Sequence, residues 1–260
     1  MLRAALQHPR LDRLFSLDPT AVEPLQRLRG AVHVTALPDP VPARRPALTR
    51  PALTRPAQAE RSIHARFGLP ADRTLLLLFG VLNERKGIAE VFAALDRLSE
   101  DNARRFALLL AGPVAESLRG NMSGWIARAR ARGVAVALHD AFVQEEEIQA
   151  LLEASDALLL CYQRHIGSSA VLIRAAGAGL PVVGQAYGLM GDHIARHRLG
   201  CPVDSDDPAS IAAALAVLAR DPALTDHFDK RLARQFAEAN TVEAYTTTLL
   251  RAFAPSTLPH

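Results

Sequence analysis

The feature that most constrains the fold of this chain is a regular alternation of short apolar runs with helical patterns from Gln58 onward. The apolar runs recur at intervals of roughly 30 residues, which is the length of one strand–helix–strand unit. Runs that are apolar throughout predict strands buried on both faces, as in parallel sheets covered by helices. The six expected strands are 74–79, 106–111, 134–138, 156–161, 181–184 and 201–203. The sequence therefore predicts an α/β fold with a doubly wound, Rossmann-like parallel sheet.

Helical patterns fill the intervals between these runs and continue after the last strand. Gly179 and Pro181 end one of them, because glycine terminates helices and proline cannot continue them. The expected helices run through Ile63 and Phe67, over about 87–98, around Trp125, and over 145–154, 170–178, 192–197, 208–218, 222–238 and 242–253.

The segment before residue 38 holds too few elements to form a domain by itself. After one helix near its start, it carries a strand at 13–17, a helix at 21–28 and a strand at 32–37. We expect residues 1–37 to be the remnant of an N-terminal domain, or an edge added to the main sheet.

A proline-rich stretch follows this segment. Residues 38–57 contain six prolines and the tandem repeat PALTR, so they predict a linker without regular structure. Residues 58–260 then form a single main domain with helices at its C-terminal end.

The size and composition of the chain predict a soluble globular protein. With 260 residues and 49% hydrophobic composition, it can build an ample core. The longest apolar run, at 75–79, is much shorter than a membrane span, and the N-terminus lacks a signal-like apolar core. We therefore expect a cytoplasmic protein with no transmembrane segment, although peripheral membrane contact is compatible with this composition.

The composition also argues against several kinds of site. A net charge of +3 and 5% aromatic residues do not indicate a nucleic-acid partner. Cys161 and Cys201 stand far apart, outside any metal-binding spacing, and we interpret both as small core residues. His139, Asp140 and the acids at 145–147 do not form a metal-ligating pattern either, so we expect no metal.

The most distinctive chemistry lies in residues 158–192, which predict a strand, a loop, a helix, a second strand and a glycine turn. Gly167, Ser168 and Ser169 stand directly before the helix. A helix amino terminus leaves backbone N–H groups free and attracts anions. Serine is also a common helix cap, so capping alone explains the same residues. In a doubly wound sheet this loop would lie in the ligand crevice at the carboxyl ends of the strands.

The loop after the first strand, GVLNERKG at 80–87, is the second candidate for phosphate binding. It joins two glycines to a basic pair before a helix, but it matches neither GxxxxGK[ST] nor GxGxxG. Two interpretations fit Lys86 equally. It binds a pyrophosphate as a point charge, or it forms a solvated charge pair with Glu84.

Residues for covalent or acid–base catalysis are not evident in the crevice loops. The sequence contains no GxSxG elbow and no nucleophile–base pair that spacing reveals. Any chemistry would therefore depend on positioning and charge.

Five segments occur in an order that is more specific than any one of them. They are Gly80 with Lys86-Gly87, the strand end Leu110-Ala111-Gly112, the run LLEASD at 151–156, the sequence AGLPVV at 178–183, and Gly188 with Asp192. Together they resemble the C-terminal, donor-binding domain of GT-B-fold glycosyltransferases of the family 4 type, over about residues 58–225. The resemblance implies a nucleotide-diphosphate sugar as substrate and no cofactor.

This sequence departs from the family's pattern at the charged positions. The family's loop grips the diphosphate with Arg and Lys; here Lys86 matches, whereas Val81 stands in place of Arg. The family's two Glu residues, near the transferred sugar and at the ribose, correspond to Ile166 and Arg174. Neither carboxylate is present.

The loops and the resemblance together predict one donor- and phosphate-binding site, with no catalytic residue identified. Its candidate residues are Gly80, Lys86, Gly87, Gly112, His165, Gly167, Ser168, Ser169, Arg174, Gly188 and Asp192. Arg174 either contacts phosphate or pairs with an acid as a structural residue. His165 either contacts the donor or is satisfied by the backbone. Asp192 matches the acid of the family's Gly-Gly-x-x-Glu turn, with Leu189 in place of the second glycine.

The leading hypothesis is a glycosyltransferase-like domain, of the hexosyltransferase class, that binds a nucleotide sugar and transfers the sugar to an acceptor. The family binds acceptors on an N-terminal domain for which residues 1–37 are too few, so we expect a truncated gene product or a separate acceptor-domain chain. The alternative is a catalytically inactive interaction or scaffold domain derived from this fold. An isomerase or hydrolase of nucleotide sugars is disfavoured, because no acid–base pair is evident.

Overall fold

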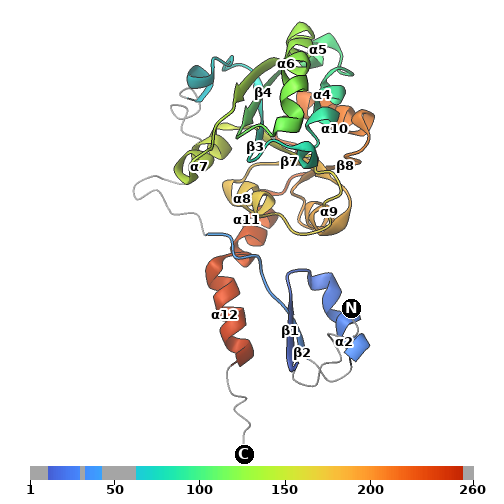
Figure 1. Ribbon diagram of the computed structural model, residues 1–260, viewed down its shortest axis with the longest axis vertical. Helices are drawn as coiled ribbons and strands as arrows, with labels where there is room; N and C mark the ends of the chain where they lie inside the picture. The colour runs from blue at the N-terminus through green and yellow to red at the C-terminus, as the bar shows by residue number, and fades with distance from the viewer. Residues whose placement is uncertain (1–10, 30–32, 43–62, 254–260) are drawn as a thin grey trace, which may run out of the picture.

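The computed structural model describes residues 11–29, 33–42 and 63–253, which form a large α/β unit and a smaller unit below it (Figure 1). The large unit contains a six-stranded sheet in the order β5-β4-β3-β6-β7-β8, and every pair of neighbours is parallel. Its strands are β3 (Thr74–Phe79), β4 (Phe106–Ala111), β5 (Ala135–His139), β6 (Ala157–Leu160), β7 (Val182–Gln185) and β8 (Gly200–Val203). The predicted doubly wound sheet is confirmed.

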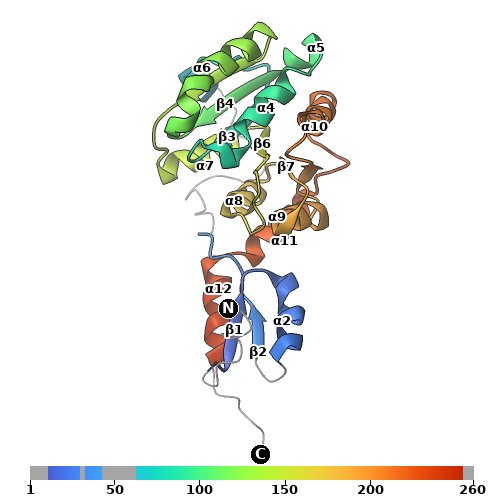
Figure 2. The same ribbon diagram turned by 45° about the vertical axis from the view of Figure 1, so that its right-hand side comes forward.

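Helices cover both faces of this sheet, which accounts for the strands being apolar throughout. On β3, Leu76 and Leu78 belong to the core of one face, and Leu75 and Leu77 to the core of the other. The first face is covered by α4 (Ile88–Leu95), α6 (Glu116–Ala131) and α10 (Pro208–Arg220). The second is covered by α7 (Glu145–Ala154), α8 (Ala170–Ala178), α9 (Gly188–Arg196) and α11 (Lys230–Ala239) (Figure 2).

The N-terminal segment forms a sheet of its own rather than an edge of the main one. In it β1 (Arg13–Ser16) pairs in parallel with β2 (His33–Ala36), and η1 (Pro19–Ala21) and α2 (Val22–Arg29) connect the two strands. The last helix, α12 (Val242–Phe253), leaves the large unit and lies beside β1 (Figure 1). The rings of Phe15 and Phe253 are 5.9 Å apart. The chain therefore crosses twice between the two units.

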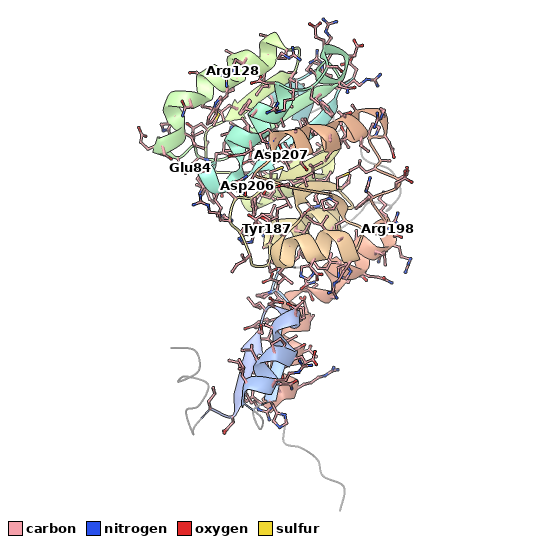
Figure 3. All side chains as sticks on the ribbon, turned by 90° about the vertical axis from the view of Figure 1, so that its right-hand side faces the viewer. Glu84, Arg128, Tyr187, Arg198, Asp206 and Asp207 are labelled. Carbon is pink, nitrogen blue, oxygen red and sulfur yellow. The ribbon has the colours of Figure 1, made fainter. Side chains whose placement is uncertain are left out.

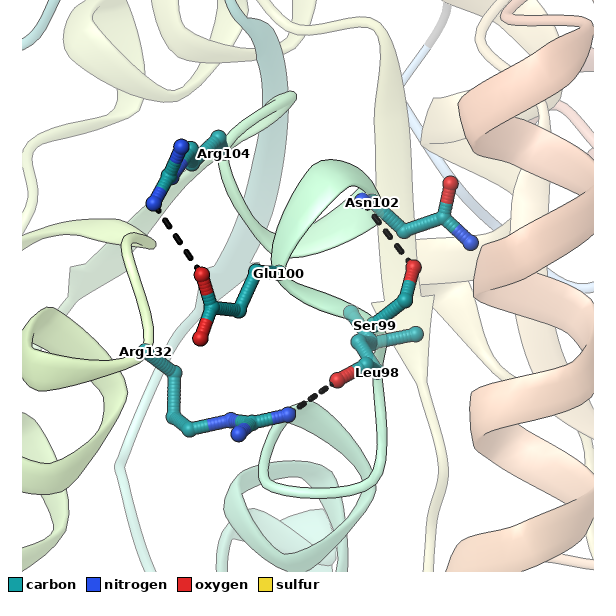
Figure 4. Close-up of polar contacts among 6 residues, drawn as sticks. All are labelled: Leu98, Ser99, Glu100, Asn102, Arg104 and Arg132. Carbon is teal, nitrogen blue, oxygen red and sulfur yellow. Dashed lines mark hydrogen bonds and ion pairs between the residues drawn. The ribbon is translucent and has the colours of Figure 1, made fainter.

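Three expected helices have other bounds in the structure. The one expected at 87–98 ends at Leu95, because Ser99 caps a separate short helix, α5 (Glu100–Ala103), by accepting from Asn102 N at 3.3 Å (Figure 4). The one expected at 222–238 begins only at Lys230. Residues 222–229 form turns instead, since the Asp221 carboxylate accepts from the backbone N–H of Thr225 at 2.7 Å.

The third difference concerns the predicted glycine turn at 188–192. Gly188 is the first residue of α9, so the helix expected at 192–197 begins four residues earlier. Residues 63–67 are helical as expected. The expected first helix falls mostly, and the linker from residue 43 onward wholly, outside the described residues. None of the described helices is long and apolar enough to cross a membrane.

Candidate functional site

The loops at the carboxyl edge of the sheet are packed together by close backbone approaches. A Cβ atom on Gly112 would lie 1.9 Å from the Gly80 carbonyl oxygen, and one on Gly87 would lie 2.0 Å from the Cys161 carbonyl oxygen. Both glycines have positive φ, where side chains are strained. The loops after β3, β4 and β6 therefore meet at one edge, where a doubly wound sheet binds its ligands.

The loop before α9 joins the same edge. The N–H of Leu189 donates to the Ile166 carbonyl oxygen at 3.0 Å, so Gly188 lies against the β6–α8 loop. The loop that carries Ser168 therefore lies against Gly87 at one point and against Gly188 at another, while Gly112 lies against Gly80.

Lys86 lies inside this edge rather than on the surface, with only 4% of the residue exposed. It ends the short 3-10 helix η2 (Glu84–Lys86), which follows β3. Its Nζ donates to the Phe79 carbonyl oxygen and to the Tyr162 hydroxyl, both at 2.9 Å. Burial, and secondarily the charge of Arg85, lower the pKa of Lys86 to about 8. The interpretation of Lys86 as part of a solvated charge pair is therefore wrong.

Tyr162, which the sequence analysis did not include in the site, lies at the centre of these contacts. The Lys86 ammonium is 4.6 Å from the centre of its ring, the Arg85 guanidinium 5.0 Å, and the His165 ring 5.4 Å. The signal in the sequence was its position directly after a buried strand, where side chains reach the ligand crevice.

The amino terminus of α8 is capped by its own serine and approached by an acid from the N-terminal segment. Ser169 Oγ accepts from Leu172 N at 3.3 Å. Ser168 Oγ donates to the Asp39 carboxylate, and His165 Nε2 lies 2.8 Å from the Ser168 carbonyl oxygen. Asp39 is a further member of the site that the sequence did not reveal, because it was assigned to the linker.

Two of the predicted site residues, Arg174 and Asp192, form ion pairs with other side chains of the chain. Arg174 Nη1 lies 2.5 Å from Glu145 Oε1 at the start of α7, which agrees with its interpretation as a structural residue. Asp192 pairs with Arg196 one turn along α9, at 2.6 Å. A Cβ atom on Gly167 would make an ordinary van der Waals contact with the His165 ring at 3.8 Å, so this glycine is not required by a close approach.

A cavity of about 460 Å³ opens next to the Lys86 loop. It is lined by Glu84, Arg85, Glu90, Gln163, Arg164 and Asp206. Glu84 and Asp206, which are 122 positions apart in the sequence, lie near each other on one side of the large unit (Figure 3). Within the described ranges no group of three or more His, Cys, Asp or Glu side chains could hold a metal ion.

Solved structures share this fold. A sucrose-phosphate synthase from Thermosynechococcus elongatus is 21% identical with a TM-score of 0.71, covering 97% of this chain and 59% of its own. HepE from Anabaena, solved in complex with UDP, is 12% identical with a TM-score of 0.71, covering 94% and 64%. A glycosyltransferase from Rickettsia africae is 15% identical with a TM-score of 0.68, covering 96% and 65%.

This chain therefore spans about three fifths of the length of these structures. No match was found among curated proteins. The model of the family described as glycosyl transferases group 1 matches residues 73–221, which is more than half of the chain. The chain belongs to the group 1 glycosyl transferase family, and its large unit has the fold of a GT-B C-terminal domain.

Proposed function

We propose that the large unit binds a nucleotide sugar by its diphosphate, between Lys86 and the amino terminus of α8, and that the sugar is transferred to an acceptor. The observation that carries this proposal is the environment of Lys86. A buried ammonium group is costly unless acceptors satisfy it. Two of its three N–H donors are used, by Phe79 and Tyr162, and within the described part of the chain no acceptor takes the third.

The amino terminus of α8 supplies the second half of the proposed anion site. Its first backbone N–H groups and its dipole favour negative charge. Lys86 is connected to it through Tyr162 and through His165, whose Nε2 lies 2.8 Å from the Ser168 carbonyl oxygen. A diphosphate held by both would be stabilised as it leaves the sugar, which is the contribution expected of charge and orientation in such a site.

The neighbouring HepE structures contain UDP, and one of them also contains glucose. UDP is therefore the first probe for this chain. We propose that the acceptor binds to another domain, which is either linked in cis or supplied by a separate chain. Transfer of a hexose, the absence of a cofactor and a cytoplasmic location stay predictions.

The binding proposal is tested by calorimetry with UDP on wild type, Lys86→Ala and Lys230→Ala. Loss of a charge-assisted phosphate contact should weaken binding by about 1.5–3 kcal/mol, roughly ten- to a hundredfold. Lys230, the only other lysine in the sequence, is the matched control and should leave the affinity unchanged. Equal affinities for wild type and Lys86→Ala would remove Lys86 from the site.

A catalytically inactive scaffold domain is the second candidate function. It is favoured by the two positions where the family has carboxylates. Ile166 is 78% exposed, and Arg174 is paired with Glu145. On this view no nucleotide would produce heat in the same titration.

Measurement of catalytic turnover further distinguishes a sugar-transferring domain from an inactive scaffold domain. Because positioning of two substrates supplies much of such a rate, we predict that residues 1–260 alone do not transfer sugar efficiently, and that Arg174→Glu does not restore transfer. The measurement is product formation from a panel of nucleotide sugars with lipid, saccharide and small-molecule acceptors. Multiple turnovers by this polypeptide alone would contradict the prediction.

A further inference from the structure

Tyr162 is the residue through which the parts of the proposed anion site touch. Its hydroxyl oxygen accepts from Lys86 Nζ at 2.9 Å. Its ring lies edge-on to His165. His165 Nε2 in turn lies 2.8 Å from the carbonyl oxygen of Ser168, next to the cap of α8, so Tyr162 connects Lys86 with the loop that leads into α8.

The backbone of Tyr162 is fixed as firmly as its side chain. Its carbonyl oxygen accepts from Ser205 Oγ at 2.8 Å and from the Tyr187 hydroxyl at 3.4 Å. The next residue, Gln163, donates its N–H to the Arg85 carbonyl oxygen at 2.8 Å. The ring is itself only 3% exposed. These contacts hold Tyr162 in place, and its hydroxyl accepts from the Lys86 ammonium.

We propose that Tyr162 is a positioning residue for nucleotide binding: its hydroxyl holds the Lys86 ammonium at a fixed place relative to the α8 amino terminus, so that one diphosphate contacts both. This inference rests on the proposed function of the site. Tyr162 acts through Lys86 and need not touch the nucleotide.

The hydroxyl also affects the proton of Lys86. An acceptor hydrogen bond favours the charged ammonium, whereas burial favours the neutral amine. The other groups around Lys86 are Arg85 on η2 and His165 and Ser169 on the β6–α8 loop, with Glu90 on α4 facing nearby Cys161. Because burial and Arg85 already lower the pKa of Lys86 to about 8, loss of the hydroxyl should lower it further.

The test measures UDP binding by calorimetry between pH 7 and 9.5 for wild type, Tyr162→Phe and the control Tyr245→Phe. Wild type should lose affinity as the pH rises through about 8, because the neutral amine does not attract phosphate. Tyr162→Phe should bind about tenfold more weakly at pH 7, as expected for one hydrogen bond to a charged group, and lose its remaining affinity at a lower pH. Tyr245→Phe removes a hydroxyl from α12, outside the site, so it should match wild type.

A second measurement follows Lys86 directly and needs no ligand. Since the chain contains only two lysines, labelling of lysine Cε gives two NMR signals, and Lys230→Arg assigns them. The Lys86 signal should titrate near pH 8 in wild type and at a lower pH in Tyr162→Phe.

The outcomes separate this inference from the proposed function. If wild type binds UDP and Tyr162→Phe keeps both the affinity and the Lys86 titration of wild type, Tyr162 has no positioning role. A purely structural role would lower the affinity by one factor at every pH and leave the titration unchanged, which also overturns the inference. If wild type binds no nucleotide at all, the proposed function fails first.

Discussion

At the scale of single residues, the proposed binding site needs Lys86 to be charged, whereas the stability of the folded state favours a neutral side chain at this buried position. A lysine that is 4% exposed carries a charge where burial favours the neutral form. Its folded-state pKa of about 8 lies below the ordinary value of 10.5, which the unfolded chain retains. The charge that would attract a diphosphate therefore reduces the stability of the folded state at neutral pH.

The lowered pKa of Lys86 predicts how the free energy of unfolding changes with pH. Between about pH 8 and 10.5 the unfolded chain binds more protons at Lys86 than the folded chain, so this residue makes the free energy of unfolding rise with pH. The rise should be about 3 kcal/mol across the window. Urea denaturation of wild type and Lys86→Met at pH 7.5 and 10 measures it as the change in their difference, in which the titrations of Cys161 and Cys201 largely cancel.

Parallel curves for the two proteins would mean that Lys86 keeps an ordinary pKa when folded. Nucleotide binding should change in the opposite direction over the same range, since it needs the protonated amine. The site is therefore expected to bind best where its lysine destabilises the fold most.

At the scale of elements, the carboxyl edge depends on glycines that let neighbouring loops touch. Gly112 directly follows β4 and has φ +144°, and its missing side chain leaves room for the Gly80 carbonyl oxygen. The loops that follow β3 and β4 can therefore lie in direct contact, and Lys86, in the loop after β3, is buried at this edge of the sheet.

Gly112→Ala should destabilise the protein by about 3 kcal/mol or more, because strain at positive φ adds to a contact with backbone that cannot move away. Gly124→Ala is the matched control. Gly124 lies exposed on α6 with open space around it, so the same substitution should stabilise by about 0.5–1 kcal/mol. Chemical denaturation of both variants tests the pair; a similar small effect in each would show that the close approach is not needed.

At the scale of the whole molecule, two segments of the chain connect the large unit with the smaller one, and these two segments also contact each other. Val41 and Thr241 form an isolated bridge, and the N–H of Asp39 donates to Asn240 Oδ1 at 3.1 Å. The same Asp39 contacts Ser168 at the amino terminus of α8. A carboxylate from the connection between the units therefore stands where the diphosphate is proposed to bind.

Asp39→Asn should raise the affinity for UDP about two- to fivefold at low salt, because it removes a negative charge near the α8 terminus worth about 0.3–1 kcal/mol. The gain should shrink as salt screens the charge. Asp101→Asn removes the same charge from α5, away from the site, and serves as control. Calorimetry with UDP at two salt concentrations measures the effect of the Asp39 charge on affinity. Equal affinities for the two variants would show that Asp39 does not compete with the ligand.

The sequence by itself determined the sheet and most of its helices. The bounds expected for β3, β4 and α7 agree with the structure to the residue, since continuous apolar runs and an acidic helix start are local signals. The resemblance also placed the glycines and Lys86 at one edge, because parallel strands bring their following loops together.

Only the tertiary structure decided how the charged residues are used. The burial of Lys86 against Tyr162, the pairing of Arg174 with Glu145 and the contact of Asp39 with Ser168 join residues that are 76, 29 and 129 positions apart. The position of α12 beside β1 is of the same kind. Such contacts depend on how helices and crossing segments pack in three dimensions. A local pattern determines which face of an element is apolar, but it does not determine which distant side chain that element will meet.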